Sequence, residues 1–116
     1  MSLTMITLLK RREGMSKADF IAYYESTHRL IGEKVLSGYA TRYRRRHLHP
    51  ADGQDAPHDF DVVLELEFPN QAACDAFFAS LDEDLLREIS EDEERLFDRS
   101  RMRSYIVEDH ESVLSA

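Results

Sequence analysis

Four segments of the chain have sequence patterns typical of β-strands. The clearest is 60–68, where every second residue is apolar. Residues 4–10 are apolar on both sides, as in a strand covered on both faces. Residues 40–49 and 101–108 complete the set. We predict that 40–49 lies at an edge of the sheet, because its three consecutive arginines discourage pairing with a further strand.

Two other stretches carry the period of amphipathic helices. The first begins at the capping residue Ser16 and ends near Gly38. An apolar stripe along it predicts packing against a sheet, and its members are Phe20, Tyr24, Thr27, Ile31 and Val35. The second begins at Asn70 and reaches about Leu81. The acidic segment 82–98 that follows indicates one broken helix or two short ones.

The resulting order, β-α-β-β-α-β, predicts a single α+β domain of the ferredoxin-like kind over residues 1–116. Its four-stranded antiparallel sheet would carry helices on one face only. The other face would expose Met5, or Ile6 and Leu8, from the first strand, and Tyr105 and Val107 or their neighbours from the last, which is too much apolar surface for a small monomer. We therefore expect a homodimer in which a second copy covers that face by two-fold symmetry.

Composition narrows the range of partners. The net charge of −8 argues against nucleic acid as a partner, because nucleic acid attracts clustered positive charge.

Cys74 is the single cysteine, so we expect no internal disulfide and interpret it as a buried thiol in a reducing compartment. No apolar run approaches the roughly 20 residues that span a bilayer, and the N-terminal order of apolar and basic residues is the reverse of a secretory signal. We expect a cytoplasmic protein.

His28 is the first candidate for chemistry. A neutral imidazole both accepts and donates protons near neutral pH. Helix pitch places it one turn after Tyr24 and close to the predicted sheet. The alternative, a hydrogen-bonded packing residue, is the commoner role of a histidine that borders an apolar stripe. On the first hypothesis His28 acts as acid and base and Tyr24 orients the substrate.

Carboxylates on the polar side of segment 60–68 are the next candidates. Asp61 and Glu65 point away from the predicted helices, toward the face that a second copy would cover. In the first hypothesis Asp61 would help Tyr24 to orient the substrate for His28, and Glu65 would contact the ligand. The alternative is structural charge pairing across the neighbouring strand, because buried carboxylates need partners.

The register of that neighbouring strand stays open. If Arg45 pairs with Val63, the side chains of Tyr43 and His47 face the carboxylates. A slip of one residue would turn Tyr43 and His47 to the opposite face of the sheet and place Arg44 and Arg46 beside the carboxylates instead.

The remaining candidates are aromatic and imidazole side chains on strands. Tyr43 and Tyr105 have hydroxyls that would orient an apolar ligand. His47, His49 and His58 have donors that a transition metal accepts, but their spacing matches no closed zinc module, and we expect no metal and no cofactor. A glycine-rich phosphate loop and a nucleophile elbow are absent from the sequence, which excludes phosphoryl transfer and acyl-enzyme chemistry.

Several of these residues form a pattern that resembles the EthD family. The pattern runs over nearly the whole chain and consists of Leu8-Leu9-Lys10-Arg11, Gly14-Met15-Ser16, Phe20, Tyr23-Tyr24-Glu25 with His28, the segment Asp92 to Asp98, and Val107-Glu108. The resemblance implies a dimeric α+β barrel in which two sheets enclose a pocket for a small molecule. It also implies a setting in catabolism, such as ether degradation, or in secondary metabolism, where some relatives are polyketide dehydratases.

Two functional hypotheses follow. The first is a cofactor-free dehydratase, isomerase or cyclase that acts on an apolar, aromatic or polyketide-like molecule in the barrel. A close variant is oxygen-dependent oxidation, as in related monooxygenase barrels. The second is a non-catalytic accessory protein that holds such a molecule for a partner enzyme of a degradation pathway. A further alternative is that the protein's own side chains fill the barrel and the dimer serves only as a scaffold.

Overall fold

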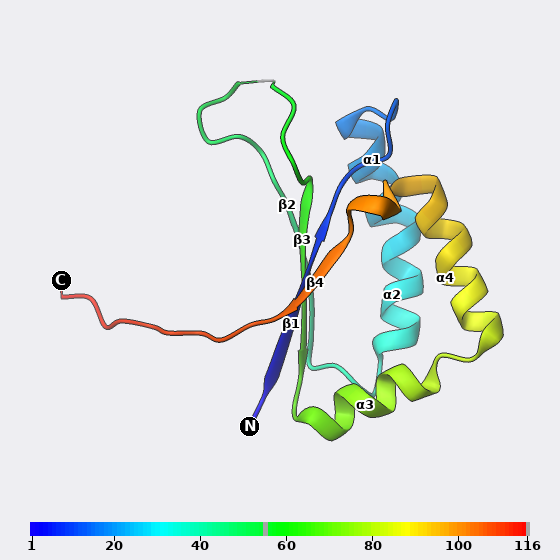
Figure 1. Ribbon diagram of the computed structural model, residues 1–116, viewed down its shortest axis with the longest axis vertical. Helices are drawn as coiled ribbons and strands as arrows, with labels where there is room; N and C mark the ends of the chain where they lie inside the picture. The colour runs from blue at the N-terminus through cyan, green and yellow to red at the C-terminus, as the bar shows by residue number, and fades with distance from the viewer. Residues whose placement is uncertain (55, 116) are drawn as a thin grey trace.

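The fold is an antiparallel sheet with a layer of helices on one face (Figure 1). The computed structural model describes residues 1–54 and 56–115. In chain order its elements are β1 (Leu3–Leu9), α1 (Lys17–Tyr23), the π-helix η1 (Tyr24–His28), α2 (Arg29–Leu36), β2 (Arg42–His47), β3 (Val62–Phe68), α3 (Gln71–Ser80), α4 (Glu83–Leu96), the 3₁₀ turn η2 (Arg99–Arg101) and β4 (Arg103–Ile106).

The strand order in the sheet is β2-β3-β1-β4, and each pair of neighbours is antiparallel. This arrangement confirms the predicted ferredoxin-like α+β fold and the position of β2 at an edge. Figure 1 shows the helices on one side of the sheet and the C-terminal tail leaving on the other. Along the described residues, no helix has the length and apolar character needed to cross a bilayer.

The helices differ from the prediction in two ways. The stretch from Ser16 to Gly38 is interrupted by η1, and the acidic segment forms one 14-residue helix, α4, so the predicted break is wrong. The caps are as predicted or of the same kind. The Ser16 and Asn70 side chains accept hydrogen bonds from the N–H groups of α1 and α3, and Asp82 does so for α4.

The core lies between sheet and helices in two clusters. The first contains Leu9, Phe20, Tyr24, Val62, Leu96 and Phe97. The second contains Leu36, Leu66, Phe68, Cys74 and Phe77. The interpretation of Cys74 as a buried thiol is confirmed, and burial raises its pKa.

The register of β2 on β3 settles the choice that the sequence left open. Arg45 pairs with Leu64, so the register that sets Arg45 against Val63 is wrong. On the face without helices, the four strands place side by side the residues Arg44, Glu65, Ile6 and Tyr105. Tyr43 and His47 are therefore on the helix side, because alternate residues of a strand point to opposite faces.

Candidate functional site

A π-helical turn carries the histidine that the sequence indicates. Such a turn fits one extra residue into a helix, which shifts the buried side after it by one position, and π-turns are frequent at functional sites. After η1, Leu36 is more deeply buried than Val35, and Gly32 lies against Tyr43 of the sheet. The shift brings His28 over the core, where its ring meets Tyr24 and Phe97.

His28 is fixed by a carboxylate that sequence reasoning did not single out. Its Nδ1 lies 2.7 Å from Asp92 Oδ2, across the gap between η1 and α4. The other oxygen of Asp92 accepts hydrogen bonds from the Tyr23 hydroxyl and, at 3.3 Å, from Arg95 Nη1. Asp92 is buried, which alone would raise its pKa, but the hydrogen bonds from Tyr23 and His28 outweigh this and lower it. Asp92 is therefore ionised and connects Tyr23, His28 and Arg95.

Aromatic rings surround the imidazole edge to face. The ring centroid of His28 is 5.2 Å from that of Tyr24 and 5.4 Å from that of Phe97. His47 reaches the other side of Tyr24 at 5.6 Å. These contacts and the Asp92 hydrogen bond fix the ring plane of His28, whose side chain keeps 12% of its exposure. Within the described residues, its Nε2 makes no hydrogen bond and is the atom left for chemistry.

A second charged cluster ties η1 to the edge strand. Glu25 accepts hydrogen bonds from Arg45 at 2.7 and 3.0 Å, and its Oε2 lies 2.9 Å from His47 Nε2. The hydrogen bonds from Arg45 are the main reason why the pKa of Glu25 falls to about 2. Arg45 also lies over the Tyr43 ring, 4.7 Å from its centroid. The buried Nδ1 of His47 has no hydrogen-bond partner among the described residues.

The tyrosines of this region are kept protonated. Burial, with a smaller contribution from the neighbouring Tyr43, raises the pKa of Tyr24 well above its usual value. Burial also raises the pKa of Tyr43.

Burial likewise raises the pKa of Glu93, which lies close enough to His28 for the two charges to interact.

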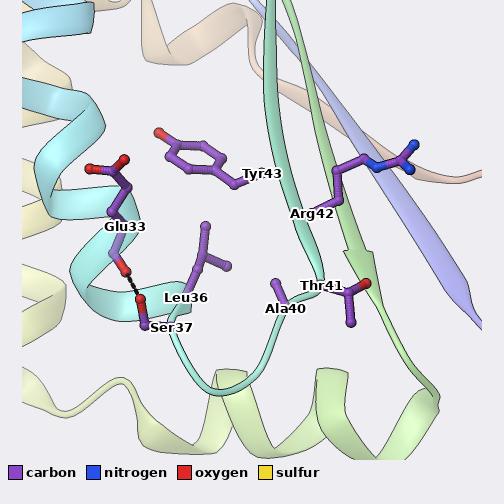
Figure 2. Close-up of a pocket in the computed structure, with 7 residues that line it drawn as sticks. All are labelled: Glu33, Leu36, Ser37, Ala40, Thr41, Arg42 and Tyr43. Atoms are coloured by element: carbon purple, nitrogen blue, oxygen red, sulfur yellow. Dashed lines mark hydrogen bonds between the residues drawn. The ribbon is translucent and has the colours of Figure 1, made fainter.

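A small pocket opens beside Tyr43, between α2 and β2. Its volume is about 160 Å³. Figure 2 shows Tyr43 pointing toward α2 while its neighbour Arg42 points away through the sheet. Leu36 and Ala40 contribute apolar side chains to the lining of this pocket, and Glu33 contributes a carboxylate. This space is on the same side of the sheet as His28.

The open face of the sheet holds a larger and more polar depression. Its volume is about 550 Å³, and it is bordered by the arginines of β2, by Ile6 and Val63, and by the start of the C-terminal tail. Glu65 is buried at its base and pairs with Arg46 at 2.6 Å and with Arg42 at 3.4 Å. Burial raises the pKa of Glu65, but these ion pairs dominate and lower it.

Asp61 lies at the end of β3, apart from both spaces. It is 1% exposed and accepts a hydrogen bond from the Arg11 backbone N–H at 2.7 Å. Lys10 Nζ is 3.7 Å from its carboxylate, and His58 Nε2 is 3.4 Å from Oδ1. These contacts hold the loop before β3 against the end of β1, which is a structural arrangement.

The structure thus divides the predicted site residues instead of bringing them together. His28, Tyr24 and Tyr43 are on the helix side, whereas Glu65 and Tyr105 are on the open face. The placement of Tyr43 beside Glu65 is therefore wrong, because the register turns it away.

The histidines considered for a metal are also separated. His47 binds Glu25, His49 is exposed after the strand, and His58 lies beside Asp61. Nowhere in residues 1–54 and 56–115 do three histidine, cysteine or carboxylate side chains converge as metal ligands would.

Solved structures with the same fold cover nearly the whole chain. An ethyl tert-butyl ether D (EthD) family protein from Bacillus halodurans is 15% identical, with a TM-score of 0.65 over 95% of this chain and 100% of that one. SnoaB, a cofactor-independent oxygenase from Streptomyces nogalater, is 11% identical, with a TM-score of 0.59 over 98% of both chains. A dimeric protein of unknown function and ferredoxin-like fold from Bacteroides fragilis is 13% identical, with a TM-score of 0.57 over 91% of this chain and 92% of that one. At such identities the likeness is one of fold.

Comparison with curated proteins finds no match. The sequence model of the EthD domain matches residues 12–100, which include the π-turn, the edge strand and the helix that carries Asp92. This chain therefore belongs to the EthD family.

Proposed function

We propose that the chain is a cofactor-free enzyme that moves a proton on a small apolar, aromatic or polyketide-like molecule, with His28 as acid and base. The observation that carries the proposal is the buried hydrogen bond between His28 Nδ1 and Asp92. A carboxylate on one ring nitrogen fixes the tautomer and leaves the other nitrogen to take up a proton.

The surrounding groups support this chemistry. Asp92 is ionised, so it stabilises the imidazolium that forms when Nε2 removes a proton from carbon or oxygen. Tyr23 and Arg95 hold Asp92 in place and act as positioning residues. Tyr24 is fully buried against the His28 ring, and we assign it a positioning role instead of direct contact with substrate.

The reaction class that fits is dehydration, isomerisation or cyclisation, in which one base removes a proton from an activated carbon and returns it elsewhere. Tyr43 keeps its proton and would donate a hydrogen bond to a substrate oxygen from the pocket of Figure 2. The apolar side chains that line that pocket suit an aromatic or alkyl group.

A panel of aryl ketones in D₂O tests the proposal without knowledge of the natural substrate. Nuclear magnetic resonance follows exchange of the proton next to the carbonyl, and thermal shift follows binding. We expect His28→Gln to reduce exchange about 100-fold or more while binding persists, because glutamine keeps a hydrogen bond to Asp92 but is no base. Lys34→Gln, which removes only an exposed ion pair with Glu88, is the control. Equal exchange by His28→Gln and the parent would refute the role of His28.

The second candidate is a non-catalytic protein that holds a small molecule for a partner enzyme. The observation that favours it is the open-face depression, where the buried Glu65 is neutralised by ion pairs with Arg42 and Arg46. Tyr105 and Glu65 would then contact the ligand. Binding of panel compounds without any exchange in the parent protein would favour this function.

Both candidates include a homodimer that buries the open face. Ile6 and Tyr105 lie there with no helix above them, and Tyr105 is 49% exposed. A solution mass near twice 13.5 kDa would support the dimer. A mass near 13.5 kDa at micromolar concentration would exclude it.

A further inference from the structure

The C-terminal tail leaves the fold on the side that has no helices. Val107 still donates a backbone hydrogen bond to Thr4, and then the chain departs from the sheet. Figure 1 shows it extending outward from the open face. We call residues 108–115 the C-terminal arm. In the described part of the chain, the only side-chain hydrogen bond of the arm is internal, between His110 and Glu108.

The chemistry of the arm does not suit a free tail. Glu108, Asp109 and Glu111 give its first half a charge of −3 when His110 is neutral. Its second half carries Val113 and Leu114, which are 100% and 86% exposed. An acidic segment followed by an apolar tip is complementary to a surface with basic and apolar halves.

The open face has such a surface. Arg42, Arg44 and Arg46 all point to it from β2, and we call these three the arginine row. Arg42 and Arg46 share Glu65, whereas Arg44 forms no ion pair or hydrogen bond with any described residue. Next to the row lie the apolar side chains of Val63 and Ile6.

The arm does not use the arginine row of its own chain. Asp109 and Glu111 border the same depression, but neither forms an ion pair with an arginine in the residues that the structure describes. Eight residues in extended form reach about 26 Å. Packed sheets are about 10 Å apart and three strand spacings span about 14 Å, so the arm is long enough to cross to a facing sheet and traverse it.

We propose that in the homodimer each C-terminal arm crosses to the other copy, where its acidic residues pair with that copy's arginine row and its apolar tip packs on the strands beside it. The proposal rests on the homodimer proposed above. Each depression is then completed by the partner's arm, and Arg44 gains the partner that it lacks within one chain. Two exchanged arms in a two-fold dimer give two equal contacts.

Complementary charge reversal tests the exchange. One variant carries Asp109→Lys and Glu111→Lys, and the other carries Arg44→Glu. Each homodimer sets like charges against each other at both arms, so we expect its dissociation constant to rise about tenfold or more in analytical ultracentrifugation. In a heterodimer of the two variants, the basic arm of one chain faces the Arg44→Glu row of the other, and the native acidic arm faces the native row. Both contacts then join opposite charges, so we expect heterodimers to form with nearly the parent affinity. The control variant carries Glu83→Lys and Asp84→Lys, two exposed reversals on α4 far from the arm.

A cross-link then identifies the chain to which the arm belongs. In a Cys74→Ser background, Val113→Cys in one chain is mixed with Val63→Cys, on the apolar surface beside the arginine row, in another under oxidising conditions. The expected product is a disulfide-linked pair of different chains. A variant that carries both cysteines in one chain is the complementary test. A disulfide formed within that single chain would overturn the exchange. A dimer whose affinity ignores the reversals would overturn it while leaving the homodimer intact, and a monomeric parent protein would overturn both.

Discussion

The ion pairs of Glu25 predict a pH-dependent part of the stability. Glu25 projects from the π-turn to Arg45 and His47 on β2, and these contacts lower its pKa from 4.5 to about 2. We consider Glu25→Gln, which keeps the shape and removes the charge. Because Glu25 binds β2 to the same turn that carries His28, its loss measures how firmly that turn is held.

The magnitude follows from the pKa shift. At full strength the shift is equivalent to about 3 kcal/mol. The Glu25 side chain is 35% exposed, so solvent screening reduces this to about 1–2 kcal/mol. The unfolded chain protonates Glu25 near pH 4.5, whereas the folded chain does so only near pH 2. The contribution is therefore complete above pH 4.5 and is lost as the pH falls from 4.5 to 2.

Urea denaturation of the parent and of Glu25→Gln at equal protein concentration, at a series of pH values from 7 to 2.5, measures this difference. We expect Glu25→Gln to be about 1–2 kcal/mol less stable at pH 7 and the gap to close as the pH approaches 2. Glu33→Gln is the matched control, because Glu33 pairs with the single residue Arg29 on the exposed side of α2 and its loss should cost below about 0.5 kcal/mol. A gap for Glu25→Gln that does not change with pH would show that it reflects packing and not charge.

Two further substitutions test the packing around the site. Gly32→Ala should destabilise the protein by about 1–3 kcal/mol, although alanine is the better helix former, because its Cβ would overlap the Tyr43 hydroxyl and lie only 2.6 Å from Tyr43 Cζ. Urea denaturation measures the loss, and adding Tyr43→Phe should recover part of it; full additivity would contradict the clash. Asp61→Asn should lower stability by about 1–3 kcal/mol, because it removes the charge that Lys10 and Arg11 face, and leave ligand binding unchanged. Weaker ligand binding at an unchanged melting temperature would instead show that Asp61 contributes to the binding site.

The fold was predictable because its signals are local. The alternation in β3 and the caps Ser16 and Asn70 each indicate an element without reference to the rest of the chain. The π-turn has no such signal. It adds one residue to a helix whose sequence is compatible with an uninterrupted α-helix, and it is the packing of Tyr24 and His28 on Phe97 that accommodates the extra residue.

The candidate site was predictable in part. His28 and Tyr24 were found from their place on the apolar stripe, but Asp92 was missed because it stands in an acidic run that suggests a solvated face. Its helical phase was the available signal, since Leu85, Ile89, Asp92 and Leu96 share one side of α4. The register of β2 was out of reach because Glu25 holds Arg45 from an element 20 residues earlier.

Strand β2 connects the two sides of the sheet on which the proposals depend. Tyr43, Arg45 and His47 face the helices and the π-turn, and the arginine row occupies the alternate positions of the strand, on the open face. A slip of one residue would exchange these two sets. The Glu25 contacts to Arg45 and His47 oppose such a slip, because it would carry both partners to the far side of the sheet. The same ion pairs that hold the proposed acid–base turn therefore also keep the arginine row where a second copy can reach it.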